Sequence, residues 1–313
     1  MGARLSIKPA ADFCLPRDAC SNGFMLLAPN RWSFGSQSLD RPLSLDGRAV
    51  RVRVSQPGAS PDDCSSWGAP VGIAVDGALA RDERAAVKQL IARMLRVHDD
   101  VQGLHDVDTR LRATGRGRIS RSPTFFEDVI KTITSCNVQW GGTVAMNAGL
   151  CALSAGGAFP AAAKLARTRP ATLRAKCRVG YRDVSIIRTA KLFASGNADP
   201  AWFEDPARED DELFAALKRL PGVGPYAAGN LMQLLGRYSR LAIDTETLRH
   251  ARTALGMTGD ERALRKKVEA HYERFGAERF RVYWFELLAE YETKHGPIWM
   301  WSSDNGAGDI TKP

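Results

Sequence analysis

The sequence predicts an α+β fold, in which an N-terminal antiparallel β-sheet domain precedes an all-helical core. Two periodicities support this prediction. At Val50–Val54 and Val71–Val75, β-branched residues alternate with other residues, as in strands that place one face on a core. From Val87 onward, apolar residues recur at every third or fourth position instead, as on one face of a helix.

We assign residues 1–112 to the sheet domain. Turn-forming residues cluster between its apolar segments, as at positions 56–63, and such clusters indicate turns between strands. The short apolar run Phe24–Leu27 is included among the expected strands. A helix follows, which either closes this domain or begins the next one. Its apolar face consists of Val87, Leu90, Ile91, Met94 and Leu95.

We assign residues 113–300 to the helical core, which begins with a Gly- and Arg-rich loop at 113–121. The sequence pattern predicts one helix at 125–137 and another at 143–155. Near the end of the core, an apolar stripe at helical spacing predicts a further helix. The stripe consists of Phe280, Tyr283, Trp284, Leu287, Leu288 and Tyr291. The remaining residues, 301–313, are expected to form an irregular tail.

The composition is that of an ordinary globular protein in which basic residues outnumber acidic ones. Among 313 residues, 44 are basic and 35 acidic, which gives a formal net charge of +9. This balance favours polyanionic partners, such as nucleic acid or an anionic membrane surface. No segment approaches the roughly 20 apolar residues of a membrane span, and the first residues lack the apolar core of a signal peptide. The six cysteines form no Cys-x-x-Cys pair, which favours free thiols in a reducing compartment.

Basic residues are concentrated between positions 164 and 191. This segment contains nine basic residues and a single acidic one, Asp183. A basic stretch beside a Gly-containing turn can follow a phosphate backbone. The alternative is a solvated basic surface, which the segment taken alone slightly favours.

The most informative segment is Leu220–Tyr226, with the sequence Leu-Pro-Gly-Val-Gly-Pro-Tyr. Pro221 and Gly222 are expected to end a preceding helix. Gly222 and Gly224 permit a tight turn and leave no side chain to block a close approach, and Pro225 suits the first turn of a new helix. The unpaired N–H groups at that helix start form an anion site that suits a DNA phosphate. The alternative is a corner between two helices that binds no ligand.

Asp244 is the second informative residue. It follows a short apolar run and precedes a segment whose Leu248, Ala251 and Leu255 share one helical face. Asp244 is therefore expected at the N-cap of a helix, where Asp is strongly preferred. By itself, an Asp at this position need be nothing more than a cap.

Together, the hairpin Leu220–Ala228 and the Asp-Thr-x-x-x-Arg that begins at Asp244 resemble the helix–hairpin–helix (HhH-GPD) DNA glycosylase superfamily. Three further segments are similar to its 3-methyladenine and 8-oxoguanine branch, namely Arg93–Asp100, Phe125–Asn137 and Gly180–Arg182. The resemblance extends over most of the chain. It implies an α+β protein with a helix–hairpin–helix glycosylase core.

The resemblance also implies roles for individual residues. Asp244 would be the catalytic carboxylate, which stabilises positive charge on the deoxyribose and orients the attacking water. The residues expected to hold the DNA backbone are Leu220, Pro221, Gly222, Val223, Gly224 and Tyr226. The candidates for the wedge that fills the gap left by a flipped base, or for the base pocket, are Asn137, Gln139, Trp140, Tyr181 and Arg182. Plain core packing is an equal alternative for Trp140. No cofactor and no catalytic metal are expected, and the hairpin carbonyls could hold a monovalent ion.

Departures from the family pattern restrict the activity and the cofactors that we expect of this protein. Bifunctional members carry a Lys just after the second hairpin Gly that forms a Schiff base with the sugar, but residues 225–230 contain no Lys, and Lys218 precedes the hairpin. No cysteine follows Cys177, which excludes the C-terminal iron–sulfur cluster of the endonuclease III branch. The signature of zinc deaminases is also absent. Glu246 replaces a His of many members, and either alters the local charge or serves as a first-turn acid.

The expected function is that of a monofunctional DNA glycosylase of base excision repair. It would flip a damaged, alkylated base out of double-stranded DNA and hydrolyse its N-glycosidic bond. We expect a monomer without membrane contact, cytoplasmic and nucleoid-associated if the protein is bacterial. The alternatives are a non-catalytic duplex-binding protein, or a glycosylase with lyase activity for uracil, a mispair or an oxidised base. Aromatic residues available for a base pocket are Trp32, Phe126, Trp140, Tyr181, Trp202, Tyr226, Trp284, Trp299 and Trp301.

Overall fold

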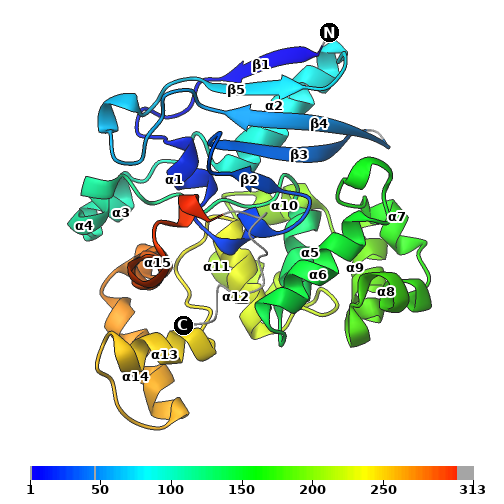
Figure 1. Cartoon of the computed structure of the whole chain (residues 1–313). Helices are drawn as coiled ribbons and strands as arrows, with labels where there is room; N and C mark the ends of the chain where they lie inside the picture. Colours follow the sequence, from blue (N-terminus) through cyan, green and yellow to red (C-terminus); the bar gives the residue numbers. More distant parts are fainter. Residues whose placement is uncertain (1, 46, 302–313) are drawn as a thin grey trace.

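The computed structural model describes residues 2–45 and 47–301. Its N-terminal part contains a five-stranded antiparallel sheet with the strand order β1-β5-β4-β3-β2 (Figure 1). The strands are β1 (Ala3–Ile7), β2 (Arg31–Ser33), β3 (Ser38–Leu45), β4 (Arg48–Ser55) and β5 (Val71–Val75). The predicted sheet is confirmed, and β4 and β5 contain the two segments in which residues alternate.

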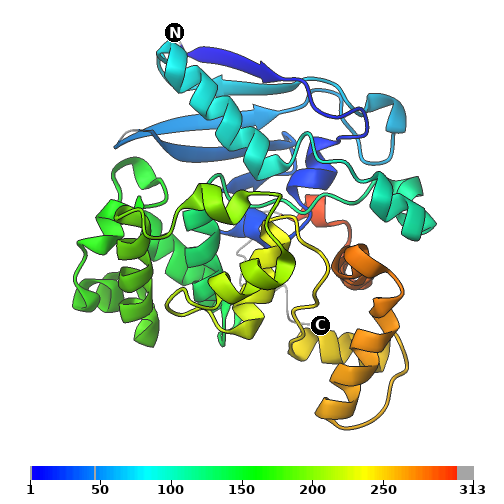
Figure 2. The ribbon, with the colours of Figure 1, turned by 180° about the vertical axis from the view of Figure 1, so that it is seen from behind.

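Helix α2 (Arg81–Leu95) lies across one face of this sheet (Figure 2). Val52 and Val54 of β4 are buried, and they share one hydrophobic core with Val87 and Ile91 of α2. The alternation in β4 therefore places its valines on the covered face, while Arg51 and Arg53, which alternate with them, are exposed. This is the packing that the sequence pattern predicts.

The expected strand at Phe24–Leu27 is wrong, because the chain forms a 3₁₀ turn at Gly23–Leu26 instead. Asn22 caps this turn, and its Oδ1 accepts a hydrogen bond of 2.7 Å from the Phe24 N–H. A side chain that bonds the neighbouring backbone in this way competes with strand pairing. The apolar residues here consequently serve two purposes, since Met25 and Leu26 are buried in a core while Phe24 lines a cavity.

The sequence pattern did not predict three of the strands, β1, β2 and β3. Strand β1 lies at the edge of the sheet and pairs with β5 alone. Strand β3 contains Pro42, which argues against a central strand because proline cannot donate to the ladder. The structure accommodates Pro42 because β2 pairs only with the Ser38–Asp40 part of β3. Pro42 therefore has no neighbouring strand on the β2 side, and its missing N–H leaves no hydrogen bond unmade there.

The rest of the chain is mainly helical, as predicted. The helices other than α2 are α1 (Leu15–Ala19), α3 (Gln102–Val107), α4 (Thr109–Thr114), α5 (Phe125–Ser135), α6 (Trp140–Cys151), α7 (Ala162–Ala166), α8 (Pro170–Cys177), α9 (Asp183–Ala194), α10 (Pro200–Glu204), α11 (Asp210–Leu217), α12 (Pro225–Leu234), α13 (Thr245–Thr253), α14 (Glu261–Glu273) and α15 (Arg279–His295). None of the helices in the described part of the chain combines the length and apolarity needed to cross a bilayer.

Two helix boundaries differ from the prediction. The helix expected at 125–137 ends at Ser135, because Asn137 adopts the left-handed conformation with φ of 51°. The helix expected at 143–155 runs instead from Trp140 to Cys151. The turn between these two helices is therefore short, and it places Trp140 at the beginning of α6.

The protein contains two hydrophobic cores that do not follow the order of the chain. The first joins the sheet and α2 to α13, α14 and α15, while the second lies among helices α5 to α12. The last long helix thus packs beside the N-terminal part (Figure 1). The division at residue 112 remains a prediction. Of the expected tail at 301–313, only Trp301 lies within the described residues.

Candidate active site

The predicted hairpin joins α11 to α12. Gly222 has a φ of 85°, and a Cβ there would lie 2.8 Å from the Cβ of Ser185 on α9. Gly224 is open, since no atom would lie within 4 Å of a Cβ at this position. Leu220 and Val223 are buried and anchor the turn. Gly222 is therefore required by conformation and packing, whereas Gly224 leaves the backbone accessible to a ligand.

Asp244 is the N-cap of α13, as predicted. Its Oδ1 accepts hydrogen bonds from the Thr247 N–H at 2.9 Å and from Thr247 Oγ1 at 3.0 Å. Its Oδ2 accepts a third from the hydroxyl of Tyr226 at 2.9 Å. Thr247 Oγ1 also lies 2.8 Å from the hydroxyl of Tyr283 on α15. The carboxylate is thus held by groups from two helices and supported by a third.

The close approach of α12 to the segment before α13 brings Tyr226 to Asp244. A Cβ at Gly229 would lie 3.1 Å from the Cβ of Ala242, so the absence of a side chain at Gly229 allows this approach. The carbonyl of Ile243 accepts a hydrogen bond from Arg265 at 3.1 Å. Both contacts fix the backbone immediately before the N-cap.

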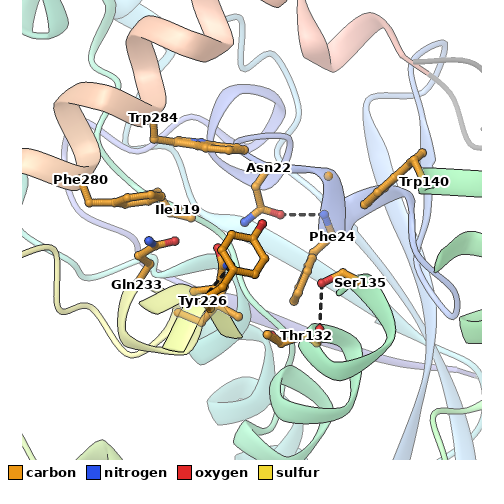
Figure 3. Close-up of a pocket in the computed structure, with 13 residues that line it drawn as sticks. Asn22, Phe24, Ile119, Thr132, Ser135, Trp140, Tyr226, Gln233, Phe280 and Trp284 are labelled. Carbon is orange, nitrogen blue, oxygen red and sulfur yellow. Dashed lines mark hydrogen bonds between the residues drawn. The ribbon is translucent and has the colours of Figure 1, made fainter. Parts of the chain in front are cut away.

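Asp244 faces a cavity with two adjoining chambers. The outer chamber has a volume of about 290 Å³ and contains Asp244, and the inner chamber has a volume of about 230 Å³. Residues that line both are Gly23, Trp140, Tyr226, Asn230, Phe280 and Trp284. The inner chamber extends between α5 and α12 toward Phe24, Thr132 and Gln233 (Figure 3).

Aromatic side chains form much of the cavity wall. Phe280 and Trp284 on α15 are stacked, with ring centroids 6.1 Å apart and planes inclined by 18°. Figure 3 shows these two rings on one side of the inner chamber and Trp140 on the opposite side. The cavity therefore offers flat, polarisable walls against which a planar ring can stack.

The ionisable lining of the cavity is negative. Asp244 and Glu246 line the outer chamber, and none of the described residues that line either chamber is Lys, Arg or His. Partial burial and the adjacent Asp244 carboxylate raise the pKa of the Tyr226 phenol well above its usual range. Tyr226 consequently remains a neutral hydrogen-bond donor to Asp244 near neutral pH.

Glu246 is fixed by a network between α13 and α15. Its Oε2 accepts hydrogen bonds from the Tyr291 hydroxyl at 2.6 Å and from Arg249 Nε at 2.8 Å. Arg249 also pairs with Glu290 at 2.6 Å, and Glu290 lies 2.9 Å from His250 Nδ1. Although partial burial opposes it, these hydrogen bonds lower the pKa of Glu290 to about 2. The network therefore holds Glu246 by one oxygen.

The candidates for the wedge and pocket fall in different places. Trp140 lines both chambers, while Asn137 and Gln139 are exposed on the turn before α6. Arg182 is buried, and it donates hydrogen bonds to the carbonyls of Cys136 and Asn137. Tyr181 is 72% exposed, and the Arg182 guanidinium lies 4.6 Å from its ring centre. Arg182 thus supports the turn from behind rather than lining the cavity.

Of the available aromatic residues, Trp140, Tyr226, Trp284 and Trp301 line the cavity. Trp32 is fully buried in the first core instead. Sequence reasoning missed Asn22, Phe24, Asn230 and Gln233. Their positions follow from tertiary packing, because they come from the N-terminal 3₁₀ turn and from the inner face of α12. The one available signal was the capping residue Asn22 before Gly23, which marks a turn.

The fold is that of helix–hairpin–helix DNA glycosylases, which confirms the expected resemblance at the level of the fold. The chain is similar to the 3-methyladenine DNA glycosylase of Archaeoglobus fulgidus, with a TM-score of 0.60, 19% identity, and coverage of 92% of this chain and 98% of that one. It is also similar to the apo form of the Clostridium acetobutylicum 8-oxoguanine glycosylase/lyase, with a TM-score of 0.65, 16% identity, and coverage of 92% and 97%.

A third similar structure is the 3-methyladenine DNA glycosylase of Schizosaccharomyces pombe in complex with abasic DNA. It has a TM-score of 0.50 and 20% identity, and the match covers 62% of this chain and 94% of that one. No protein-family model matches the chain, and no curated protein matches its sequence.

Proposed function

We propose that the protein is a DNA glycosylase that excises a damaged base with Asp244 as its catalytic carboxylate. The observation that carries this proposal is the cavity itself, in which Asp244 lies at the outer chamber and aromatic rings line both chambers. A nucleotide flipped out of a duplex needs such a pocket for its base. The solved structures with this fold that act on 3-methyladenine and 8-oxoguanine support the same activity.

In this proposal, Asp244 acts on the sugar. Positive charge develops on the deoxyribose as the base departs, and a fixed carboxylate stabilises it. The three hydrogen bonds to Asp244 fix its orientation before the substrate arrives.

The proposed enzyme is monofunctional, and it leaves an abasic site in an intact strand. A lyase of this kind needs an amine that can form a Schiff base with the sugar. No described lysine lines either chamber, and the hydroxyl of Tyr226 occupies the position beside Asp244. Borohydride treatment during excision is expected to trap no protein–DNA adduct. A trapped adduct would establish the lyase alternative.

The proposed substrate is an alkylated purine. Alkylation of a ring nitrogen gives the base a positive charge and weakens its glycosidic bond. Aromatic faces attract a cation by about 0.5–2 kcal/mol, and the two carboxylates of the outer chamber add to this attraction. A cavity with this lining suits a cationic base better than a neutral one.

The proposed partner is double-stranded DNA, bound by the protein as a monomer. The hairpin backbone at Gly224 would contact a phosphate, which positions the protein without reading sequence. Asn137 at the exposed turn is the proposed wedge, because Arg182 fixes that turn from behind. Gln139 and Trp140 follow it, with Trp140 placed to stack on the extruded base.

A panel of duplexes tests the proposed function. Each duplex carries one alkylated, deaminated or oxidised base, and alkali then cleaves any abasic site that the protein produces. We expect strand cleavage after alkali with alkylated purines, and no cleavage without alkali. Salt-sensitive duplex binding without base release on any duplex would instead identify a non-catalytic DNA-binding protein. Release confined to uracil or an oxidised base would replace the proposed substrate.

A further inference from the structure

Glu246 places a second carboxylate in the outer chamber, two residues beyond Asp244. Tyr291 and Arg249 both bind its Oε2, at 2.6 and 2.8 Å. Its Oε1 accepts no hydrogen bond from any residue in the described part of the chain. Since Glu246 lines the chamber, this oxygen is an unused acceptor on a carboxylate whose position is fixed.

Asp244 is bound differently, because both of its oxygens already accept hydrogen bonds. Thr247 donates twice to Oδ1 and Tyr226 donates to Oδ2. Three donors therefore fix the orientation of the Asp244 carboxylate. Each Asp244 oxygen already has a donor from the protein, whereas Glu246 keeps Oε1 available in the same chamber.

The surroundings of Glu246 are compatible with a role as a base. On its own helix it contacts Arg249, and from α15 it contacts Tyr291, while Glu290 shares the same arginine. Burial and the hydrogen bond to Glu246 raise the pKa of the Tyr291 phenol, so Tyr291 stays a neutral donor. Neither partner occupies Oε1.

We propose that the two carboxylates divide the chemistry: Asp244 stabilises the positive charge on the sugar, and Glu246 orients and deprotonates the attacking water. This inference rests on the proposed glycosylase activity. It assigns to Glu246 the task of orienting water that the sequence analysis expects of Asp244. Two carboxylates with different environments can take distinct roles in this way.

The step balances without any further reactant. The bond between C1′ of the deoxyribose and the base nitrogen breaks, and its electron pair leaves with the base. An alkylated cationic base departs neutral. The water oxygen forms a bond to C1′, and one of its protons passes to Glu246 Oε1 and then to solvent. The products are the free base and an abasic sugar.

Glu246→Gln tests the inference, because it keeps the size of the side chain and removes its basicity. The probe is duplex DNA methylated with dimethyl sulfate, and the measurement is the single-turnover release of methylated purines. We expect the rate to fall by about 10²-fold or more, which is the usual contribution of a general base. The affinity for the same DNA should stay within a factor of about three.

Glu261→Gln is the matched control. Glu261 is also a first-turn acid of a helix, and it pairs with Arg265 as Glu246 pairs with Arg249. It lies on the neighbouring α14 and lines neither chamber. Its substitution should leave the rate of base release unchanged.

Glu246→Ala separates catalysis from a structural role. Formate added to this variant can occupy the vacated space and accept the proton, so we expect it to restore part of the lost rate. Formate should not restore activity to Asp244→Asn, which lacks the fixed negative charge that stabilises the sugar cation. A purely structural role for Glu246 would not give rescue by a small acid.

The outcomes are distinguishable. If Glu246→Gln releases bases at the wild-type rate, the inference is overturned while the glycosylase proposal stands. Loss of activity together with lost DNA affinity and no rescue by formate would assign Glu246 a structural role, which also overturns it. If the wild-type protein releases no base from methylated DNA or from the panel, the proposed function fails and the inference fails with it.

Discussion

At the scale of the residue, Asp244 has more hydrogen-bond partners than an N-cap requires. The cap itself needs only the bond from the Thr247 N–H to Oδ1. The hydroxyl of Tyr226 adds a bond to Oδ2, and a simple cap has no need of it. Asp244 and Tyr226 both line the outer chamber, so this second bond fixes the carboxylate at the wall of the cavity.

Tyr226→Phe is predicted to slow base excision while leaving the fold intact. The change removes the donor to Asp244 Oδ2, so the carboxylate loses part of its orientation, and a hydrogen bond to a charged group contributes about 1.5–3 kcal/mol. We expect a drop of roughly 10-fold or more in the single-turnover rate, with stacking on the ring preserved. The protein should stay folded with a lower midpoint of thermal unfolding, and a rate of excision equal to wild type would show that Asp244 does not need this donor.

At the scale of the element, the hairpin combines two glycines with different tasks. Gly222 takes a left-handed conformation against α9, whereas Gly224 has a φ of −86° and open space around it. The sequence predicted both the turn and the N-terminal proline of α12. It could not distinguish the two glycines, because their tasks depend on Ser185, which is distant in sequence.

The two glycines give a matched pair of variants. Gly222→Ala should destabilise the protein by about 1–3 kcal/mol, because it forces an L residue into the left-handed region beside Ser185. Gly224→Ala should change stability by less than about 0.5 kcal/mol but weaken duplex binding, since its methyl group would stand between the backbone and a phosphate. Urea unfolding and fluorescence anisotropy measure the two effects. Equal DNA affinity of Gly224→Ala and wild type would remove the hairpin from the interface.

The helices around the site show the limits of local pattern. The apolar stripe on α15 was predicted as a core face, and its Phe280, Leu287 and Leu288 are buried in the first core. The same three residues also line the outer chamber, together with the other residues of the stripe. Periodicity identifies which side chains point inward, but it cannot tell a filled core from a hollow one.

At the scale of the whole molecule, the sheet and the helical core are joined by buried charges as well as by apolar contacts. Arg41 of β3 lies 3.0 Å from Glu127 of α5, and Lys131 lies 2.7 Å from the same carboxylate. All three side chains are buried. The sequence could not predict this cluster, because charged residues are not expected in a core. In addition, only the folded chain brings β3 next to α5.

Arg41→Met is predicted to destabilise the protein by about 3–5 kcal/mol, because it leaves part of the charge on Glu127 unpaired in a buried position. Arg53→Met is the control, since Arg53 pairs with Asp40 on the exposed face of the sheet and surface pairs contribute about 0–1 kcal/mol. Thermal unfolding followed by circular dichroism compares the two. Similar midpoints for both variants would show that the buried pair does not hold the two parts together.

A pair of isosteric variants separates the proposed catalytic role of Asp244 from its role as a helix cap. Asp244→Asn removes the charge at the cavity, while Asp260→Asn makes the same change at the N-cap of α14, where Oδ1 accepts a bond of 2.8 Å from the Ala263 N–H. The measurement is single-turnover release of methylated purines from duplex DNA. We expect a loss of at least about 10²-fold for Asp244→Asn and wild-type release for Asp260→Asn. Release by Asp244→Asn at the wild-type rate would show that Asp244 does not carry out the excision.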